Sequence, residues 1–311
     1  MKKTAFVLIL CSGILWGCMG LFVRVLGTIG LSAMPVVFLR ALVTAVCMVL
    51  ILLVYDRQLL RVRIKDFWCF LGTGIGSIVF FNFCYFRTVT LTSMSVAAVL
   101  LYTAPAIVTV LSCFLFHERF TVRKLLSLGL TFAGCVLVTG VLSEGAAVST
   151  KGLLLGLGAG LGYALYSIFG RYALNKGYHS LTVTCYTFIV AAVATGCMTD
   201  AKWVLKTAFQ SAEYGVIALL LGLCCTVFPY MMYTMGLRYV ENSLASVIAS
   251  VEPVTATVLG MVLYQEKLTA GGCLGIMLVI GGMAVGSLHK KETAGAEKIK
   301  EKTSAVGGKL F

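Results

Sequence analysis

The sequence predicts an all-α membrane protein with ten transmembrane helices, arranged as two inverted repeats of five helices each. Three observations lead to this prediction. The 311-residue chain is 59% hydrophobic and only 12% charged, whereas soluble domains average about 25% charged residues. Its apolar residues form ten stretches of roughly 20 residues, the length that crosses a bilayer as a helix. The second half of the chain also repeats the pattern of the first half.

Net charge and cysteine content argue against two functional classes. The net charge is +13. The basic residues lie in short loops and in the tail instead of on one soluble face, so we predict no nucleic-acid partner. The chain has 12 cysteines, nearly all within apolar stretches, and contains no CxxC motif. Such cysteines act as small apolar core residues. We therefore predict neither a metal site nor another cofactor.

The spans follow one another with short loops. Lys2 and Lys3 precede an apolar run that is too long for a signal peptide, so we expect the first span to remain as a helix. The ten predicted spans are 4–25, 35–55, 67–86, 93–116, 123–142, 152–172, 181–199, 214–236, 242–264 and 270–288. The predicted domains are a first repeat 1–142, a linker loop 143–151, a second repeat 152–288 and a polar cytoplasmic tail 289–311.

Lysine and arginine set the orientation, because cytoplasmic loops carry an excess of both. With the N-terminus inside, the inside segments hold twice as many of these residues as the outside segments, even without the tail. We therefore predict that both termini are cytoplasmic.

Two prolines mark the internal repeat. Pro105 and Pro253 are each followed, thirteen residues later, by a glutamate, Glu118 and Glu266. Sliding the chain by the separation of the prolines brings further identities into phase: Ser95/Ser243, Ala97/Ala245, Thr109/Thr257, Thr121/Thr269 and Gly134/Gly282. Because five spans is an odd number, the second copy enters the membrane from the opposite side. Inverted repeats of this kind are typical of alternating-access transporters.

Glu252 and Pro253 lie side by side near the middle of the ninth span. An ionised carboxylate at the bilayer centre costs on the order of a few kcal/mol, and proline breaks or kinks a helix. We predict helix breaks at Pro105 and Pro253, with freed carbonyl groups facing a cavity. The counterpart of Glu252 in the first copy is Ala104, so this acidic group belongs to the second half alone.

This pattern resembles the EamA-type branch of the drug/metabolite transporter superfamily. The matching residues are Trp16, Gly17, Phe22, Arg24, Pro35, Arg40, Ala97, Pro105, Glu118, Ala245, Glu252, Pro253 and Glu266. The resemblance covers residues 5–288. The second copy departs from it, since Thr187 stands at the counterpart of Arg40 and Tyr163-Ala164 replaces Trp-Gly.

The resemblance implies a ten-helix inverted-repeat fold in the bacterial inner membrane. It implies a central cavity lined mainly by spans 1, 3, 4, 6, 8 and 9. It also implies transport, often export, of amino acids and related metabolites or of lipophilic toxicants.

The candidate substrate contacts are aromatic and polar residues at the depth of this cavity. Tyrosine offers an apolar face and a hydroxyl group, which suits an amphipathic ligand such as an amino acid. The candidates are Trp16, Asn82, Tyr85, Tyr102, Tyr163, Tyr166, Tyr230, Tyr233 and Glu252. A belt of aromatic residues at the membrane surface is the alternative, but it fits the mid-span Tyr102 and Tyr163 poorly.

The charged residues within or at the ends of the spans are interpreted as follows, with two alternatives for Glu252 and two for Arg40. Glu252 contacts a substrate amine or exchanges a proton, because burial favours a neutral carboxyl; alternatively it binds carbonyl groups freed by Pro253. Glu118 and Glu266 are interpreted as helix-end contacts that fix the gates. Arg40 snorkels to the outer surface or contacts a substrate carboxylate.

The sequence thus predicts a secondary transporter, an exporter of small neutral or zwitterionic metabolites such as amino acids. Efflux of lipophilic toxicants is the alternative, and a channel or a non-transporting scaffold is less favoured. No GxxxxGK[ST], HExxH or GxSxG motif occurs, which argues against ATP drive and against an enzyme. The expected partners are a small-molecule substrate, the lipid bilayer and, if Glu252 titrates, a proton. We expect a monomer or a weak homodimer.

Overall fold

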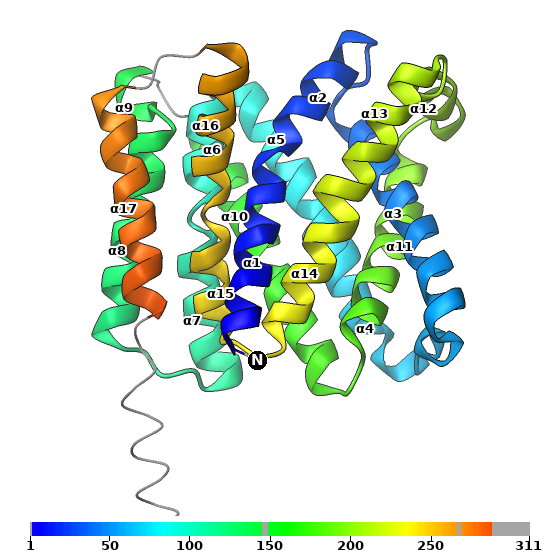
Figure 1. Ribbon diagram of the computed structural model, residues 1–311, viewed down its shortest axis with the longest axis horizontal. Helices are drawn as coiled ribbons and strands as arrows, with labels where there is room; N and C mark the ends of the chain where they lie inside the picture. The colour runs from blue at the N-terminus through cyan, green and yellow to red at the C-terminus, as the bar shows by residue number, and fades with distance from the viewer. Residues whose placement is uncertain (1, 145–148, 266–268, 288–311) are drawn as a thin grey trace, which may run out of the picture.

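The computed structural model describes residues 2–144, 149–265 and 269–287. Every regular element in these ranges is a helix, and the long helices run side by side between two ends of the molecule (Figure 1). The predicted all-α class is therefore confirmed for the described residues. Glu266 and the tail 289–311 lie outside them.

Nine helical segments in the described ranges are long and apolar enough to cross a bilayer. They are Lys3–Thr28, Ala33–Tyr55, Ile64–Leu91, Met94–Phe116, Thr150–Asn175, Ser180–Met198, Ala212–Leu237, Asn242–Tyr264 and Ala270–Ser287. The chain is a multi-pass membrane protein, as predicted.

Each predicted span consists of one to three helical elements. In the first half these are α1 (Lys2–Gly17), α2 (Met19–Thr28), α3 (Ala33–Tyr55), α4 (Phe67–Leu71), η3 (Gly72–Val79), α5 (Phe80–Leu91), α6 (Met94–Leu101), α7 (Ala104–Phe116) and α8 (Val122–Val138). In the second half they are α10 (Thr150–Asn175), α11 (Ser180–Met198), α13 (Ala212–Gly222), η4 (Leu223–Val227), α14 (Phe228–Leu237), α15 (Asn242–Ala249), α16 (Glu252–Tyr264) and α17 (Ala270–Ser287). The shorter η1 (Arg57–Leu60), η2 (Ile64–Asp66), α9 (Val141–Glu144) and α12 (Ala201–Ala208) connect them.

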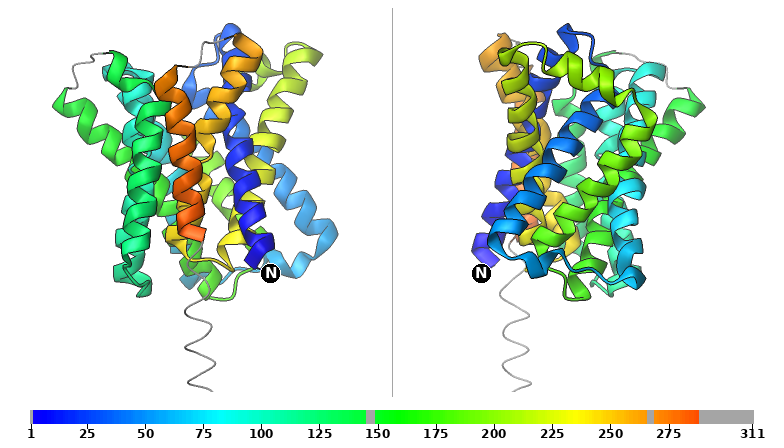
Figure 2. Two further views of the ribbon diagram at one scale, coloured as in Figure 1. Left: turned by 60° about the vertical axis from the view of Figure 1, so that its left-hand side comes forward. Right: turned by 90° about the vertical axis from the view of Figure 1, so that its right-hand side faces the viewer.

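The fifth predicted span, 123–142, is shorter than expected. Its helix α8 has 17 residues and ends at Val138. Gly140 then has a positive φ of 68°, a conformation that commonly ends helices, and the chain restarts as the separate α9. The whole of α8 lies alongside α17 (Figures 1 and 2).

Two spans are interrupted beside a proline. The break between α6 and α7 falls at Tyr102 and Thr103, and the break between α15 and α16 falls at Ser250 and Val251. Each proline occupies the first turn of the helix that follows its break. Proline is tolerated there because first-turn N–H groups have no partner within the helix.

Other irregular features recur at matching positions in the two halves. The third and eighth spans each contain a π-helical stretch, η3 and η4, a geometry that often marks functional sites. The fourth and ninth spans each end in a left-handed residue, His117 with φ 55° and Gln265 with φ 56°. His117 and Gln265 are separated by the same interval as the two prolines.

Packing contacts recur in the same way. Gly134 of α8 lies against Val279 of α17, and Gly282 of α17 lies against Thr131 of α8. The repeat aligns Gly134 with Gly282 and Thr131 with Val279, so each contact is the counterpart of the other.

A second reciprocal pair joins the first and sixth spans to the helix breaks. Gly13 of α1 lies against Val251, and Gly160 of α10 lies against Thr103. Both glycines therefore pack at a break in the helix of the other half, where a side chain would prevent close approach.

A polar clamp joins the start of the third span to the end of the sixth. Asp66 accepts hydrogen bonds from Lys176 Nζ at 2.7 Å and from the Tyr178 hydroxyl at 2.9 Å. The hydrogen bond to Asp66 raises the pKa of Lys176. Helix α4, which begins directly after Asp66, lies towards the end of the bundle that holds the N-terminus (Figure 1).

Candidate functional site

Five aromatic side chains meet in the centre of the bundle. The Trp16 ring at the end of α1 lies 5.0 Å from Tyr230 and 5.4 Å from Tyr233 of α14, measured between ring centroids. Tyr166 of α10 lies 5.0 Å from Tyr230, and Phe188 of α11 packs on Tyr230 at 4.8 Å. These separations are typical of favourable aromatic pairs.

Two of these tyrosines use their hydroxyl groups to join helices. The Tyr166 hydroxyl lies 2.7 Å from Thr234 Oγ1, and the Tyr233 hydroxyl lies 2.7 Å from Ser167 Oγ. Both bonds link α10 to α14. The Tyr166 and Tyr233 hydroxyls are thus held by other residues of the protein. The buried Trp16 Nε1, by contrast, has no hydrogen-bond partner among the described residues.

Tyr163 extends the cluster towards the third span. Its ring lies 6.2 Å from Trp16 and 5.8 Å from Phe81 of α5, and Phe81 lies 5.9 Å from Tyr85. The cluster therefore forms a continuous aromatic surface that crosses from the second half of the chain to the first.

Glu252 lies against this surface. It is the first residue of α16, directly after the break in the ninth span. Its Oε2 accepts a hydrogen bond of 3.4 Å from the Tyr163 hydroxyl. Other ionisable groups lie near enough to Glu252 to interact with its charge, among them Arg40, Tyr85, Tyr102, Cys135 and Tyr230. Tyr102 lies in the break of the fourth span, so both breaks border this region.

Arg40 does not reach the outer surface, so the snorkelling alternative is wrong. Its side chain is 2% exposed. Nη2 donates to Asn82 Oδ1 at 3.3 Å and Nη1 to Met19 Sδ at 3.6 Å. The Asn82 side chain is oriented by its own bond to the Ile78 carbonyl oxygen at 2.7 Å. The structure thus brings Asn82 together with Arg40 and places both within the bundle.

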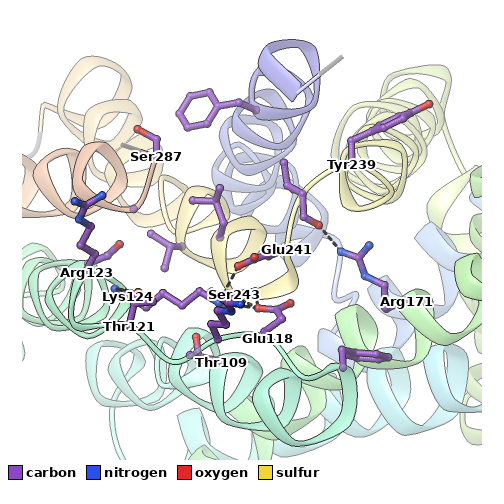
Figure 3. Close-up of a pocket in the computed structure, with 18 of the residues that line it drawn as sticks. Thr109, Glu118, Thr121, Arg123, Lys124, Arg171, Tyr239, Glu241, Ser243 and Ser287 are labelled. Atoms are coloured by element: carbon purple, nitrogen blue, oxygen red, sulfur yellow. Dashed lines mark hydrogen bonds and ion pairs between the residues drawn. The ribbon is translucent and has the colours of Figure 1, made fainter. Parts of the chain in front are cut away.

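A separate pocket of about 990 Å³ opens at the end of the bundle that holds the N-terminus. Figure 3 shows it between α1, α7, α8, α10, α15 and α17. Its charged lining residues are Lys3, Glu118, Arg119, Arg123, Lys124, Arg171, Arg238 and Glu241. Basic residues outnumber acidic ones, as the positive-inside rule expects for a cytoplasmic end.

Glu118 connects the two halves at this pocket. Its carboxylate accepts hydrogen bonds from the backbone N–H groups of Asn242, at 2.8 Å, and Ser243, at 3.4 Å, and from the Ser243 hydroxyl. Lys124 Nζ bonds the same carboxylate at 3.1 Å and Glu241 at 2.8 Å (Figure 3). Glu118 therefore caps the N-terminus of α15, where an acidic group is favoured by the helix dipole.

Arg171 holds the same helix end from the other side. Its Nε donates to Asn242 Oδ1 at 2.8 Å, and its Nη2 donates to the Val240 carbonyl oxygen. One signal in the sequence pointed to Arg171, because a shift of 147 residues aligns it with Arg24, but only as a basic residue at the end of a span. Its role in fixing α15 was not predicted.

Glu266, the predicted counterpart of Glu118, lies outside the described residues. The described ranges contain no group of three or more His, Cys, Asp or Glu side chains placed to hold a metal ion.

The model of the EamA-like transporter family matches residues 3–140 and again residues 150–288. The chain belongs to the EamA-like transporter family. The resemblance noted in the sequence is therefore confirmed, and the two matched segments correspond to the two halves that share the proline breaks.

Individual members of the EamA-like family support the same conclusion. An uncharacterized transporter of Archaeoglobus fulgidus is 29% identical over 220 residues, which cover 68% of this chain and 75% of the relative. The uncharacterized transporter YetK of Bacillus subtilis is 24% identical over 293 residues, covering 90% of this chain and 86% of YetK. These names indicate a membrane transporter.

A solved crystal structure has the same fold. It superposes with a TM-score of 0.77 at 18% identity, over 93% of this chain and 98% of the other. At this identity the likeness concerns the fold alone.

Proposed function

We propose that this EamA-like protein is a secondary carrier that exports small neutral or zwitterionic metabolites, such as amino acids, by alternating access. The observation that carries the proposal is the position of Glu252. It lies at a break in the ninth span, opposite an aromatic surface that spans both halves. Broken helices near the membrane midplane form the substrate sites of many carriers.

The proposal requires ten spans in two inverted repeats. The nine long helical segments supply nine of them, and the shorter α8 supplies the remaining one, the fifth in chain order. The reciprocal contacts support this arrangement. The repeat aligns each residue of the Gly134–Val279 contact with a residue of the Thr131–Gly282 contact. It aligns the Gly13–Val251 contact with the Thr103–Gly160 contact in the same way, to within one residue. Contacts of this kind are expected when two similar halves are related by a two-fold axis, and five spans per half make that relation an inversion.

We place the site among the predicted residues that surround Glu252. Trp16, Tyr163 and Tyr230 offer ring faces, and Glu252 offers the acceptor for a substrate amine or a proton. The other proposed substrate contacts are Asn82, Tyr85, Tyr102, Tyr166 and Tyr233. One acid and one arginine at this depth suit a solute of low net charge. A polyanion would need more buried basic residues.

The pocket beside Glu118 serves as the cytoplasmic vestibule in this mechanism. Thr109 and Val247 line it, and they belong to α7 and α15, the inner halves of the two broken spans. Glu118 and Lys124 of the first half bind α15 of the second half. Opening and closing this contact would gate the inner side, with Pro105 and Pro253 beside the hinges. Glu266 is the proposed outer counterpart.

The basic pocket also bears on the orientation of the carrier in the membrane. The basic vestibule, the N-terminus and Ser287 share one end of the bundle, which we assign to the cytoplasm. We propose that the carrier resides in the plasma membrane, the inner membrane of a bacterium, and acts as a monomer or a weak homodimer.

Efflux of lipophilic cations is a second candidate function. The aromatic rings around Glu252 favour it, because a cation over aromatic faces is stabilised by about 0.5–2 kcal/mol and a carboxylate would neutralise its charge.

Transport by purified protein in liposomes tests both candidates. We expect saturable uptake of labelled amino acids, and faster uptake when the same unlabelled solute is preloaded, since counterflow is a property of carriers. Non-saturating conductance would instead indicate a channel. Counterflow of lipophilic cations without that of amino acids would favour the second candidate.

A further inference from the structure

Arg40 is a cation enclosed in the membrane-spanning bundle without an acidic partner. It lies in α3, two turns from the helix start, and its side chain is 2% exposed. Its neighbours are the neutral Asn82 amide oxygen, the Met19 sulfur and the Tyr230 hydroxyl. Among the residues that the structure describes, no carboxylate forms an ion pair with it. A buried charge without a counter-charge is strongly unfavourable.

The guanidinium group is also underused as a donor. It has five N–H groups, and its bonds to Asn82 and Met19 are long, at 3.3 Å to oxygen and 3.6 Å to sulfur. The Tyr230 hydroxyl is a further neighbour and is likewise uncharged. Asn82 is held by the Ile78 carbonyl oxygen and so presents its amide oxygen to Arg40. This bond orients the arginine but does not neutralise it.

Glu252 is an opposite charge close enough to Arg40 for the two to interact, and both also act on Tyr230. The two groups are nevertheless not in ion-pair contact. Among the described residues, the hydrogen bond of Glu252 is the 3.4 Å bond from Tyr163. A positive group on the first half and a negative group on the second half thus stand apart, with Tyr230 near both.

We propose that Arg40 binds the anionic end of the transported solute, so that a zwitterion lies with its carboxylate on the first half and its ammonium group on Glu252 of the second half. This inference rests on the proposed carrier function and adds the orientation of the solute and the residue that selects for a carboxylate. Arginine suits this role because its planar guanidinium binds carboxylates through two parallel hydrogen bonds.

The arrangement also explains why one polar group from each half is needed. A zwitterion brings one charge of each sign, so each buried protein charge gains a partner when the solute binds. A solute that lacks the carboxylate leaves Arg40 unpaired, and this penalty discriminates against it. Thr187, the counterpart of Arg40 in the second half, bonds Thr73 at 2.6 Å and supplies no competing charge.

Paired probes test this inference in proteoliposomes. Counterflow is measured for six probes. Three are the amino acids leucine, phenylalanine and lysine, and three are the corresponding amines, which lack only the carboxylate. We expect the wild-type carrier to transport at least one amino acid and to transport its amine at least about 30-fold less efficiently, as for an unpaired buried charge. Arg40→Gln should lower amino-acid kcat/KM by a similar factor without lowering amine transport. Arg40→Lys should retain part of the amino-acid transport.

Amine transport by Arg40→Gln reports that the variant is folded, and a second readout covers the case in which amine flux is too low. The amino acid should raise the unfolding temperature of the wild type and of the exposed-site variant Arg87→Gln, but not that of Arg40→Gln. Equal loss of both fluxes, equal transport of amine and amino acid by the wild type, or an unchanged ligand-induced shift in Arg40→Gln would each overturn the inference. Counterflow of none of the six probes would refute the amino-acid function itself, and the inference with it.

Discussion

Glu252 provides the first prediction at the scale of single residues. If its carboxyl takes up and releases a proton during the cycle, Glu252→Gln should flatten the dependence of flux on pH between about pH 5 and about pH 8. The glutamine keeps the size of the side chain and can still bond Tyr163, so membrane expression should be unchanged. Flux by purified protein across this pH range is the measurement.

Glu213→Gln is the control for this experiment. Glu213 is an exposed acid in the first turn of α13, and its substitution removes the same charge without touching the cluster. A pH profile that keeps its shape in Glu252→Gln would remove Glu252 from the coupling mechanism.

Glu118 gives a second residue-scale prediction. Glu118→Ala removes the cap of α15 and leaves the N–H groups of Asn242 and Ser243 without this partner. Because the Glu118 side chain is only 8% exposed, we expect a loss of about 3 kcal/mol in stability. Flux should also change, since the inner gate loses its contact. Thermal unfolding in detergent and liposome flux measure the two effects.

Glu241→Ala provides the matched comparison for Glu118→Ala. Glu241 binds the same lysine but is 49% exposed, and exposed ion pairs contribute at most about 1 kcal/mol. If Glu118→Ala were as mild as Glu241→Ala, the cap would have no structural importance.

The sequence could locate Glu118 and Glu252 but not their partners. The duplicated proline-to-glutamate spacing singled out Glu118, and the position beside Pro253 at mid-span singled out Glu252. The partners of Glu118 lie 124 and 125 positions away in the chain, and the Tyr163 hydroxyl lies 89 positions from Glu252. Contacts across such separations depend on how the two halves pack, which no local pattern specifies. The burial of Arg40 was missed for the same reason.

At the scale of helices, the contact between α8 and α17 makes the third prediction. A Cβ on Gly134 would lie 2.7 Å from the Gly275 carbonyl oxygen and 2.8 Å from the Val279 backbone nitrogen. Gly134→Ala should therefore destabilise the protein by about 2 kcal/mol, as overpacking does elsewhere. Gly129 lies on the same helix and has nothing within 4 Å of an added Cβ.

Gly129→Ala should be neutral or stabilise the protein by about 0.5–1 kcal/mol, because alanine favours the helix. Thermal unfolding of the two variants side by side checks both expectations. Equal unfolding temperatures would mean that α8 and α17 do not pack this closely in the membrane.

Helix boundaries show what hydropathy alone can predict. The apolar stretches located the long helices, because the length needed to cross a bilayer is a strong constraint. They did not predict the end of α8 at Val138, where Gly140 turns left-handed, nor the interruption of the first span at Cys18. Both depend on local backbone geometry within apolar sequence, to which a hydropathy pattern is insensitive.

At the scale of the whole molecule, the two halves differ where function needs them to differ. The breaks, the π-helical stretches and the left-handed caps recur in both halves. The charges do not, since Arg40 belongs to the first half and Glu252 to the second. In the proposed mechanism, similar backbones allow the halves to exchange conformations, and unlike side chains orient the solute in the shared site.

The last prediction concerns membrane sidedness, on which the inverted repeat depends. Lys65 and Glu213 occupy equivalent positions before the third and eighth spans, yet α4 and α13 begin at opposite ends of the bundle (Figure 1). In a background without native cysteines, a membrane-impermeant thiol reagent should label Glu213→Cys in intact cells and label Lys65→Cys only after permeabilisation. Both positions are exposed, so reactivity reports the side of the membrane. Labelling of both from the same side would mean that the repeats are parallel, and alternating access by exchange of inverted halves would fail.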